Sequence, residues 1–265
     1  MISIITTVRN GESYVREMLE SVKNQTFQRF EHIIVDDGST DRTLQILDRY
    51  KLENPDFNLS VFTPGHLGRG RALNFAVANA DYDWIAIIDA DDIWHPKKLE
   101  IQYDIVNRFG IDVLATGSLL FSSSTELNFM DLKSCPDIDY YMLRDLLKTN
   151  MLSHSSVLIR KNLCFYDESR KSQFDYDLWL RLAEQRCILA KCLAPLNYHR
   201  IHSKQSFEAK MKKVYRWRAY KMKASTAWKN KEFFSLIYST GKLLFDMLFP
   251  RKIRLKIKNK LMKSS

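Results

Sequence analysis

Blocks of apolar and polar residues alternate along the first 121 positions. Short runs rich in β-branched and aliphatic residues predict strands, over 2–8, 33–35, 59–62, 84–88 and 113–121. Between these runs, apolar residues recur every three or four positions, as in amphipathic helices. The expected helices cover 13–25, Ser39 or Thr40 to Tyr50, the region around 73–77, and a stretch that Pro96 begins. Apolar strands separated by helices predict an α/β fold, with a mostly parallel sheet covered on both faces.

The remaining sequence is less regular. We expect a helix over 139–148, a strand over 157–159, a helix around 178–183 and a strand over 188–198. After Ser206 the composition changes abruptly to basic residues mixed with aromatic and aliphatic ones. We therefore expect one α/β domain over 1–206 and a basic, amphipathic helical tail over 207–265.

The net charge of the chain is +10, but it is unevenly distributed. Residues 1–206 carry 24 basic and 28 acidic residues, whereas 207–265 carry 17 and 3. A basic chain suggests nucleic acid, an anionic membrane or an anionic ligand. The tail either packs on the domain with a solvated basic face, lies on an anionic membrane, or binds RNA. We favour the membrane and expect no nucleic-acid partner, because the chain contains no recognised nucleic-acid-binding motif.

Features that would indicate export or membrane insertion are missing from the sequence. The cysteines have neither Cys-x-x-Cys nor zinc spacing, at positions 135, 164, 187 and 192. The first residues resemble no signal peptide, and no run of about 20 apolar residues occurs. We expect a cytoplasmic protein with reduced thiols, peripheral on the inner face of the membrane.

Two acidic clusters follow predicted strands. Asp36 and Asp37 come after the second strand, and Asp89, Asp91 and Asp92 come after the fourth. Carboxyl ends of parallel strands meet at one edge of a sheet, where ligands bind. A D-x-D pair can offer oxygens to Mg²⁺ or Mn²⁺ and leave positions open for phosphate. The alternatives are a helix cap at Asp92 and a simple turn after Asp36 and Asp37.

Several sequence blocks, in this order and spacing, resemble family 2 glycosyltransferases. They are Ser3 to Asn10, Gln25-Thr26-Phe27, Ile34 to Asp41, Gly68 to Asn74, and Ile88 to Asp92. The resemblance covers roughly residues 1–206 and is strongest up to about Leu120. It implies a GT-A fold, a nucleotide-sugar donor, Mn²⁺ or Mg²⁺ as cofactor, and an inverting reaction.

The resemblance also implies roles for individual residues. Donor-binding positions are Thr7, Asp37, Arg71, Asn74, Asp89 and Arg200. The metal ligands correspond to Asp91, Asp92 and His202, with the choice between Asp91 and Asp92 left open. Asp36 is expected to shape the turn rather than to bind donor.

The second half supplies the expected chemistry. Phe174 and Asp175 are similar to the family's Glu-Asp block, with Phe174 where Glu is usual. The resemblance makes Asp175 the general base, with Asp177 as its competitor. Charge in the first turn of a helix is the structural alternative for both.

Residues 198–206 are similar to the family's Tyr-x-Arg-x-His-x-x-x-Ser ending. This match suggests that His202 supports the metal or the diphosphate and that Arg200 contacts phosphate. His154 corresponds to a block on the acceptor side, and His95 and His199 are expected to be structural.

The expected activity is metal-dependent, inverting transfer from a UDP-sugar to a glycan or lipid-linked acceptor in cell-surface polysaccharide synthesis. A sugar nucleotidyltransferase would need a glycine-rich basic loop after the first strand, and residues 7–12 do not form one. A non-catalytic membrane- or nucleic-acid-binding protein with the same fold is the other alternative. The sugar and the acceptor are not specified by the motifs, because 120–175 match the family poorly.

Overall fold

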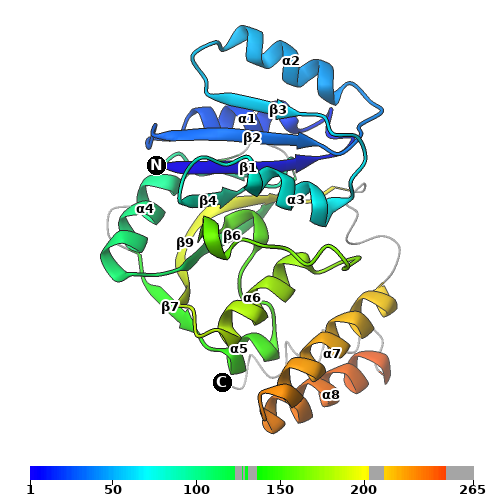
Figure 1. The fold of residues 1–265 in the computed structure, drawn as a ribbon. Coiled ribbons are helices and arrows are strands. Elements are labelled where there is room, and N and C mark those ends of the chain that lie inside the picture. Colours follow the sequence, from blue (N-terminus) through cyan, green and yellow to red (C-terminus); the bar gives the residue numbers. More distant parts are fainter. Residues whose placement is uncertain (123–126, 128, 131–135, 203–211, 249–265) are drawn as a thin grey trace. The chain divides into compact units, whose positions relative to one another are not determined.

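The chain divides into two compact units in the computed structural model (Figure 1). The structure describes residues 1–122, 127, 129–130, 136–202 and 212–248. One unit comprises 1–142 and 151–203, and the other comprises 143–150 and 204–265. The sequence pattern did not indicate that residues 143–150 group with the C-terminal helices. Ser206 and the basic stretch from 251 to 263 lie outside the described residues.

The first unit is built on a mixed sheet with a parallel core. Its strands are β1 (Ile2–Val8), β2 (Phe30–Asp36), β3 (Leu59–Phe62), β4 (Trp84–Ile87), β5 (Ile93–Trp94), β6 (Val113–Phe121), β7 (Ile138–Tyr141), β8 (Leu158–Arg160) and β9 (Leu189–Arg200). The order is β3-β2-β1-β4-β8-β6-β9-β5, and β7 also pairs with β9. The first four strands run parallel, so the carboxyl ends of β1, β2 and β4 lie side by side.

The later strands complete the sheet differently. β8 is antiparallel to both β4 and β6, whereas β6 and β9 are parallel. β5 and β7 pair antiparallel with opposite ends of β9. Through β5, the segment after β4 is therefore joined to the end of β9, which brings the second acidic cluster next to residues 198–202.

Helices cover both faces of the sheet. They are α1 (Val15–Lys23), α2 (Thr43–Glu53), α3 (Arg69–Ala78), α4 (Lys98–Phe109) and α6 (Phe174–Glu184). Apolar side chains of α1, α2 and α4 share one core cluster with Ile2, Ile4 and Ile34. α3 packs against β1 and β2, and Figure 1 shows α3 and α6 on the side of the sheet away from α1. The expected α/β architecture is confirmed.

Two local predictions were wrong. The helix expected over 139–148 begins only at Leu143, because residues 138–141 pair with β9 as strand β7. The cap expected at Ser39 or Thr40 is also absent, since α2 begins at Thr43. Asp41 accepts the Thr43 N–H at 3.0 Å instead and stabilises the helix start.

The second unit is helical in its described part. It contains α5 (Leu143–Lys148), α7 (Lys212–Lys229) and α8 (Phe233–Leu248), and α7 and α8 lie side by side (Figure 1). Ser239 of α8 donates a hydrogen bond to the Leu147 carbonyl at 3.2 Å, which joins α8 to α5. None of the helices described is long and apolar enough to cross a membrane.

Candidate active site

The carboxyl ends of β1 and β2 hold the first acidic cluster in a fixed position. Thr7 lies opposite Val35 in the parallel register, and the Asp37 N–H donates to the Val8 carbonyl at 2.8 Å. Asp36 accepts the Ser39 N–H at 2.9 Å, which agrees with a turn-shaping role. Asp37 therefore projects from a rigid turn beside the end of β1.

The side chain of Asp37 is held by the segment before α3. One carboxylate oxygen accepts the N–H groups of Leu67 and Gly68, at 2.6 and 3.0 Å. Its other oxygen lies 3.2 Å from His66 Nδ1. Gly68 has φ of +86°, a backbone conformation that favours glycine. Residues 67 and 68, just before α3, thus contribute the backbone donors that orient Asp37.

Asp89 lies at the centre of a charged group. The Arg69 guanidinium is 2.6 Å from its Oδ1, and His154 Nδ1 is 3.7 Å from the same oxygen. Burial opposes ionisation, but Arg69 holds the pKa of Asp89 well below its usual range. The charge of Asp89 in turn raises the pKa of Arg69 against desolvation, and Asp175 adds to this effect. Arg69 therefore pairs directly with Asp89 and also feels the charge of Asp175.

His154 is buried and tied to the loop that leads to α6. Its Nε2 lies 2.9 Å from the hydroxyl of Tyr166, and Ser155 accepts the Asp89 N–H at 3.0 Å. The 3₁₀ helix His154–Ser156 is thus attached directly to the second acidic cluster. The structure brings the predicted acceptor-side histidine next to Asp89.

The structure brings Asp91 and His202 together, the two residues that the sequence assigned, with Asp92, to a metal site. The two side chains are 2.9 Å apart, and the His202 ring lies against the Tyr14 ring, with centroids 4.6 Å apart. The His202 Nδ1 atom is buried and has no hydrogen-bond partner among the residues that the structure describes.

Asp92 has a different environment from Asp91. It is fully buried, and its oxygens accept the Arg200 N–H at 3.1 Å and contact His199 Nδ1 at 3.0 Å. The hydrogen bond to Asp92 raises the pKa of His199 to about 9. Asp92 therefore fastens the acidic loop to the end of β9, and its oxygens are already engaged.

Arg200 connects the same loop to α1. Its guanidinium lies 2.6 Å from the Glu17 carboxylate and donates to the Asp91 carbonyl at 2.9 Å. The side chain is only 4% exposed and is covered by the rings of Tyr14 and Phe121. These contacts show Arg200 supporting the loop that carries Asp91, and its contact with a donor phosphate stays a prediction.

The metal-ligating side chains near Asp91 suit a cation that also binds phosphate oxygens. Within the described ranges, no group of three or more His, Cys, Asp and Glu side chains is arranged to hold a metal. Asp91 and His202 offer one carboxylate and one imidazole, and Mg²⁺ or Mn²⁺ needs few protein ligands when phosphate oxygens complete its shell. The residues therefore fit a metal bound together with a diphosphate, rather than a closed protein site.

Asp175 and Asp177 lie in the first turn of α6 but have different surroundings. Asp177 is paired with Arg170 at 3.0 Å and with Arg181 at 2.9 Å. Asp175 lies two residues before Asp177, and its charge adds to that of Asp89 in raising the pKa of Arg69. Asp177 therefore has a structural explanation.

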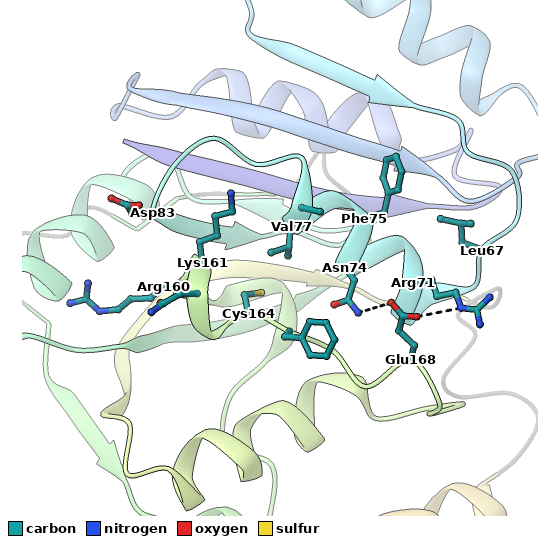
Figure 2. Close-up of a pocket in the computed structure, with 13 residues that line it drawn as sticks. Leu67, Arg71, Asn74, Phe75, Val77, Asp83, Arg160, Lys161, Cys164 and Glu168 are labelled. Atoms are coloured by element: carbon teal, nitrogen blue, oxygen red, sulfur yellow. Dashed lines mark hydrogen bonds and ion pairs between the residues drawn. The ribbon is translucent and has the colours of Figure 1, made fainter.

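Arg71 and Asn74 do not face Asp89 as Arg69 does, but line a cavity on another side of α3. Figure 2 shows both beside Glu168, at a cavity of about 970 Å³ between α3 and residues 160–168. Arg71 is 3.4 Å from Glu168, and Asn74 donates to Glu168 and to the Tyr166 carbonyl, each at 2.9 Å. In the described structure these residues hold the 166–168 segment against α3, and their contact with donor stays a prediction.

Sequence reasoning missed three residues of this site. Arg69 contacts Asp89, Glu17 contacts Arg200, and Tyr166 contacts His154. Arg69 lies inside the Gly68 to Asn74 block, so its position in that block was the available signal. Glu17 and Tyr166 lie in no matched motif, and only the fold brings them to the site.

Comparisons with known proteins agree on one family. The model of glycosyl transferase family 2 matches residues 3–164. An uncharacterised glycosyltransferase of Rickettsia typhi is 32% identical over 190 residues, 68% of this chain and 58% of the relative. The chain thus spans less than two thirds of that relative. The O-antigen biosynthesis glycosyltransferase WbnJ of Escherichia coli is 29% identical, and the match covers 78% of this chain and 82% of WbnJ.

Solved structures show the same fold. S. aureus TarS 1–349 in complex with UDP-GlcNAc has a TM-score of 0.67 at 22% identity, covering 85% of this chain and 66% of that one. The mannosyltransferase PcManGT from Pyrobaculum calidifontis was solved in complex with GDP-Man and Mn²⁺. It has a TM-score of 0.62 at 14% identity, and the match covers 99% of this chain and 80% of PcManGT. These similarities confirm the expected GT-A fold. Since the family model covers more than half of its residues, the chain belongs to glycosyl transferase family 2.

Proposed function

We propose that this chain transfers a sugar, with inversion, from a UDP-sugar to a hydroxyl of a glycan or lipid-linked acceptor in cell-surface polysaccharide synthesis. The proposal rests on one observation, the contact of Asp91 with His202 at 2.9 Å. Asp89, two residues before Asp91, is paired with Arg69. These groups come from segments far apart in the sequence, at the sheet edge where α/β proteins bind ligands.

The donor is assigned to the ends of β1, β2 and β4. Asp37 and Thr7 would contact the base, and Asp89 with Arg69 would lie toward the ribose and sugar. The named complexes support this choice, since TarS is described with UDP-GlcNAc and PcManGT with GDP-Man. UDP is preferred here on the family resemblance of the Asp37 block. The O-antigen role of the Escherichia coli relative supports polysaccharide synthesis.

Asp175 is proposed as the general base. Its carboxylate takes the proton of the acceptor hydroxyl while that oxygen forms a bond to the anomeric carbon. The bond from this carbon to the diphosphate breaks at the opposite side, and the nucleoside diphosphate leaves with the electron pair. Asp177 is the weaker candidate because two arginines neutralise it. His154 would line the acceptor side.

Asp91 and His202 would hold Mn²⁺ or Mg²⁺ together with the donor diphosphate. When bound, the cation would neutralise the negative charge that develops on the leaving nucleoside diphosphate. We favour Asp91 over Asp92, because both oxygens of Asp92 are engaged by residues of β9. Asp92 and Arg200 would then keep Asp91 in place.

We further propose that the protein works at the inner face of an anionic membrane, held by its basic C-terminal part. Residues 207–265 carry 17 basic and 3 acidic residues, and each basic residue near such a surface contributes about 1 kcal/mol. No nucleic-acid partner is proposed. A lipid-linked acceptor would make this location useful.

Donor binding tests the proposal. Thermal shift with a panel of nucleotide sugars should show stabilisation by a UDP-sugar with Mn²⁺ that is lost in EDTA or in Asp91→Ala. Asp92→Asn is the matched variant and should lower the melting temperature without donor, because it loosens the loop. A wild-type protein that no nucleotide sugar stabilises, with or without metal, would contradict the proposal.

A further inference from the structure

Helix α8 exposes a row of large apolar side chains. Phe234, Ile237, Leu244 and Leu248 are 89, 69, 52 and 73% exposed. With Gly241 between them they recur every three or four residues, within an arc of about 80° at 100° per residue. We call these five residues the apolar face of α8. The opposite side of the helix, which includes Ser235 and Ser239, is buried in the second unit.

The charge of the surrounding sequence restricts what can cover this face. Lys229 and Lys231 precede α8 together with Glu232, and Lys242 lies within it together with Asp246, so the excess of positive charge comes from the residues that follow. Residues 251–263 add seven lysines and arginines and no acidic residue. A second copy of the chain would bring a second excess of positive charge against the first. An anionic lipid surface offers both an apolar layer and the opposite charge.

The dimensions of α8 favour a position in the plane of the surface. Its 16 residues extend about 24 Å, which is shorter than the hydrocarbon core of about 30 Å. Lys242 lies in the middle of the helix, and its ammonium group would be costly to place at the centre of a bilayer.

We propose that the apolar face of α8 inserts into the head-group region of an anionic membrane, with the neighbouring lysines against lipid phosphates. This inference deepens the proposed function by naming the surface that makes the membrane contact.

The test measures partition of the full-length protein onto vesicles of equal parts phosphatidylcholine and phosphatidylglycerol. Phe234→Ser with Ile237→Ser should lower the partition coefficient about tenfold or more. Serine has a helix propensity close to those of phenylalanine and isoleucine, so α8 should persist. The matched control replaces two exposed apolar residues of the first unit, Phe109→Ser with Leu52→Ser, and should partition like the wild type.

A variant that gains binding separates this effect from misfolding. Among the described residues, and apart from the backbone of α8 itself, no atom lies within 4 Å of a Cβ built on Gly241, so Gly241→Leu starts its side chain in open space. It should raise the partition coefficient about fivefold or more. Vesicles of phosphatidylcholine alone should bind all proteins weakly.

Three results would overturn the inference. One is equal partition of the wild type and the Phe234, Ile237 double variant. Another is no gain from Gly241→Leu. The third is a wild-type dimer in sedimentation that the double variant converts to monomer without change in vesicle binding, which would assign the face to a second copy. Release of nucleoside diphosphate by the same proteins without vesicles tests the transferase proposal separately, and should be equal in all of them.

Discussion

Gly70 lies in the first turn of α3 and faces the start of α6. A Cβ at this position would lie 2.8 Å from Cε1 and 3.2 Å from Cδ1 of the Phe174 ring. Carbon atoms attract best at about 3.5–4.0 Å, so this contact is repulsive. Phe174 immediately precedes Asp175, the proposed base. We predict that Gly70→Ala displaces Phe174 and, with it, the carboxylate of Asp175.

The expected magnitudes follow from two opposing effects. Alanine favours the helix over glycine by about 1 kcal/mol, whereas overpacking costs about 1–3 kcal/mol. The free energy of unfolding should therefore fall by about 0–2 kcal/mol, too little to unfold the protein. A misplacement of about 1 Å at a reacting group can cost about 100-fold in rate. For a smaller shift we expect a loss in kcat on the order of tenfold, with donor affinity unchanged.

The assay is the initial rate of nucleoside diphosphate release, together with donor affinity and thermal unfolding. Gly70→Ala combined with Phe174→Leu should recover most of the lost rate relative to Phe174→Leu alone, because the smaller side chain removes the collision. Gly241→Ala is the matched control, since in the described part of the chain no atom beyond the backbone of α8 lies within 4 Å of its Cβ. Unchanged turnover in Gly70→Ala, or a Gly70→Ala/Phe174→Leu variant as slow as Gly70→Ala alone, would contradict the prediction.

Three further predictions concern other parts of the first unit. Asp177→Asn should lower the free energy of unfolding by about 1–3 kcal/mol through its broken arginine pairs, yet change turnover less than twofold; a stable, inactive variant would make Asp177 the base. Burial lowers the pKa of His32 from 6.5 to about 3, so the unfolded chain binds the proton first and stability falls as the pH drops below 6.5. Denaturant titrations at about pH 4.5 should show a loss on the order of 2–3 kcal/mol relative to neutral pH that His32→Gln lacks, and equal losses would contradict this. In calorimetric titrations, His202→Ala should abolish the gain in donor affinity that Mn²⁺ provides, without changing affinity in EDTA; a preserved metal effect would exclude His202 as a ligand.

The first four strands could be predicted because each carries its own signal. Residues 2–8 and 59–62 have the predicted bounds, since short apolar runs between turns leave little choice of structure. β7 could not be predicted in the same way. Asp139, Tyr140 and Tyr141 become a strand because β9 offers an edge to pair with, and β9 is some 50 residues distant in the sequence.

The candidate site was predictable where several motifs matched in order. The pairing of Asp91 with His202 lies within matched blocks, and the structure brings both together. The difference between Asp91 and Asp92 was not predictable, because it depends on which carboxylate faces β9. The role of Arg69 likewise depends on the direction in which the first turn of α3 points.

Sugar transfer from a nucleotide donor with Asp175 as the base can be measured as nucleoside diphosphate release from the stabilising UDP-sugar with Mn²⁺, compared between the wild type and Asp175→Asn. We expect release by the wild type, loss of at least about 100-fold in the variant, and equal donor affinity in both proteins. Near-normal release by Asp175→Asn would contradict the assignment of Asp175 as the base.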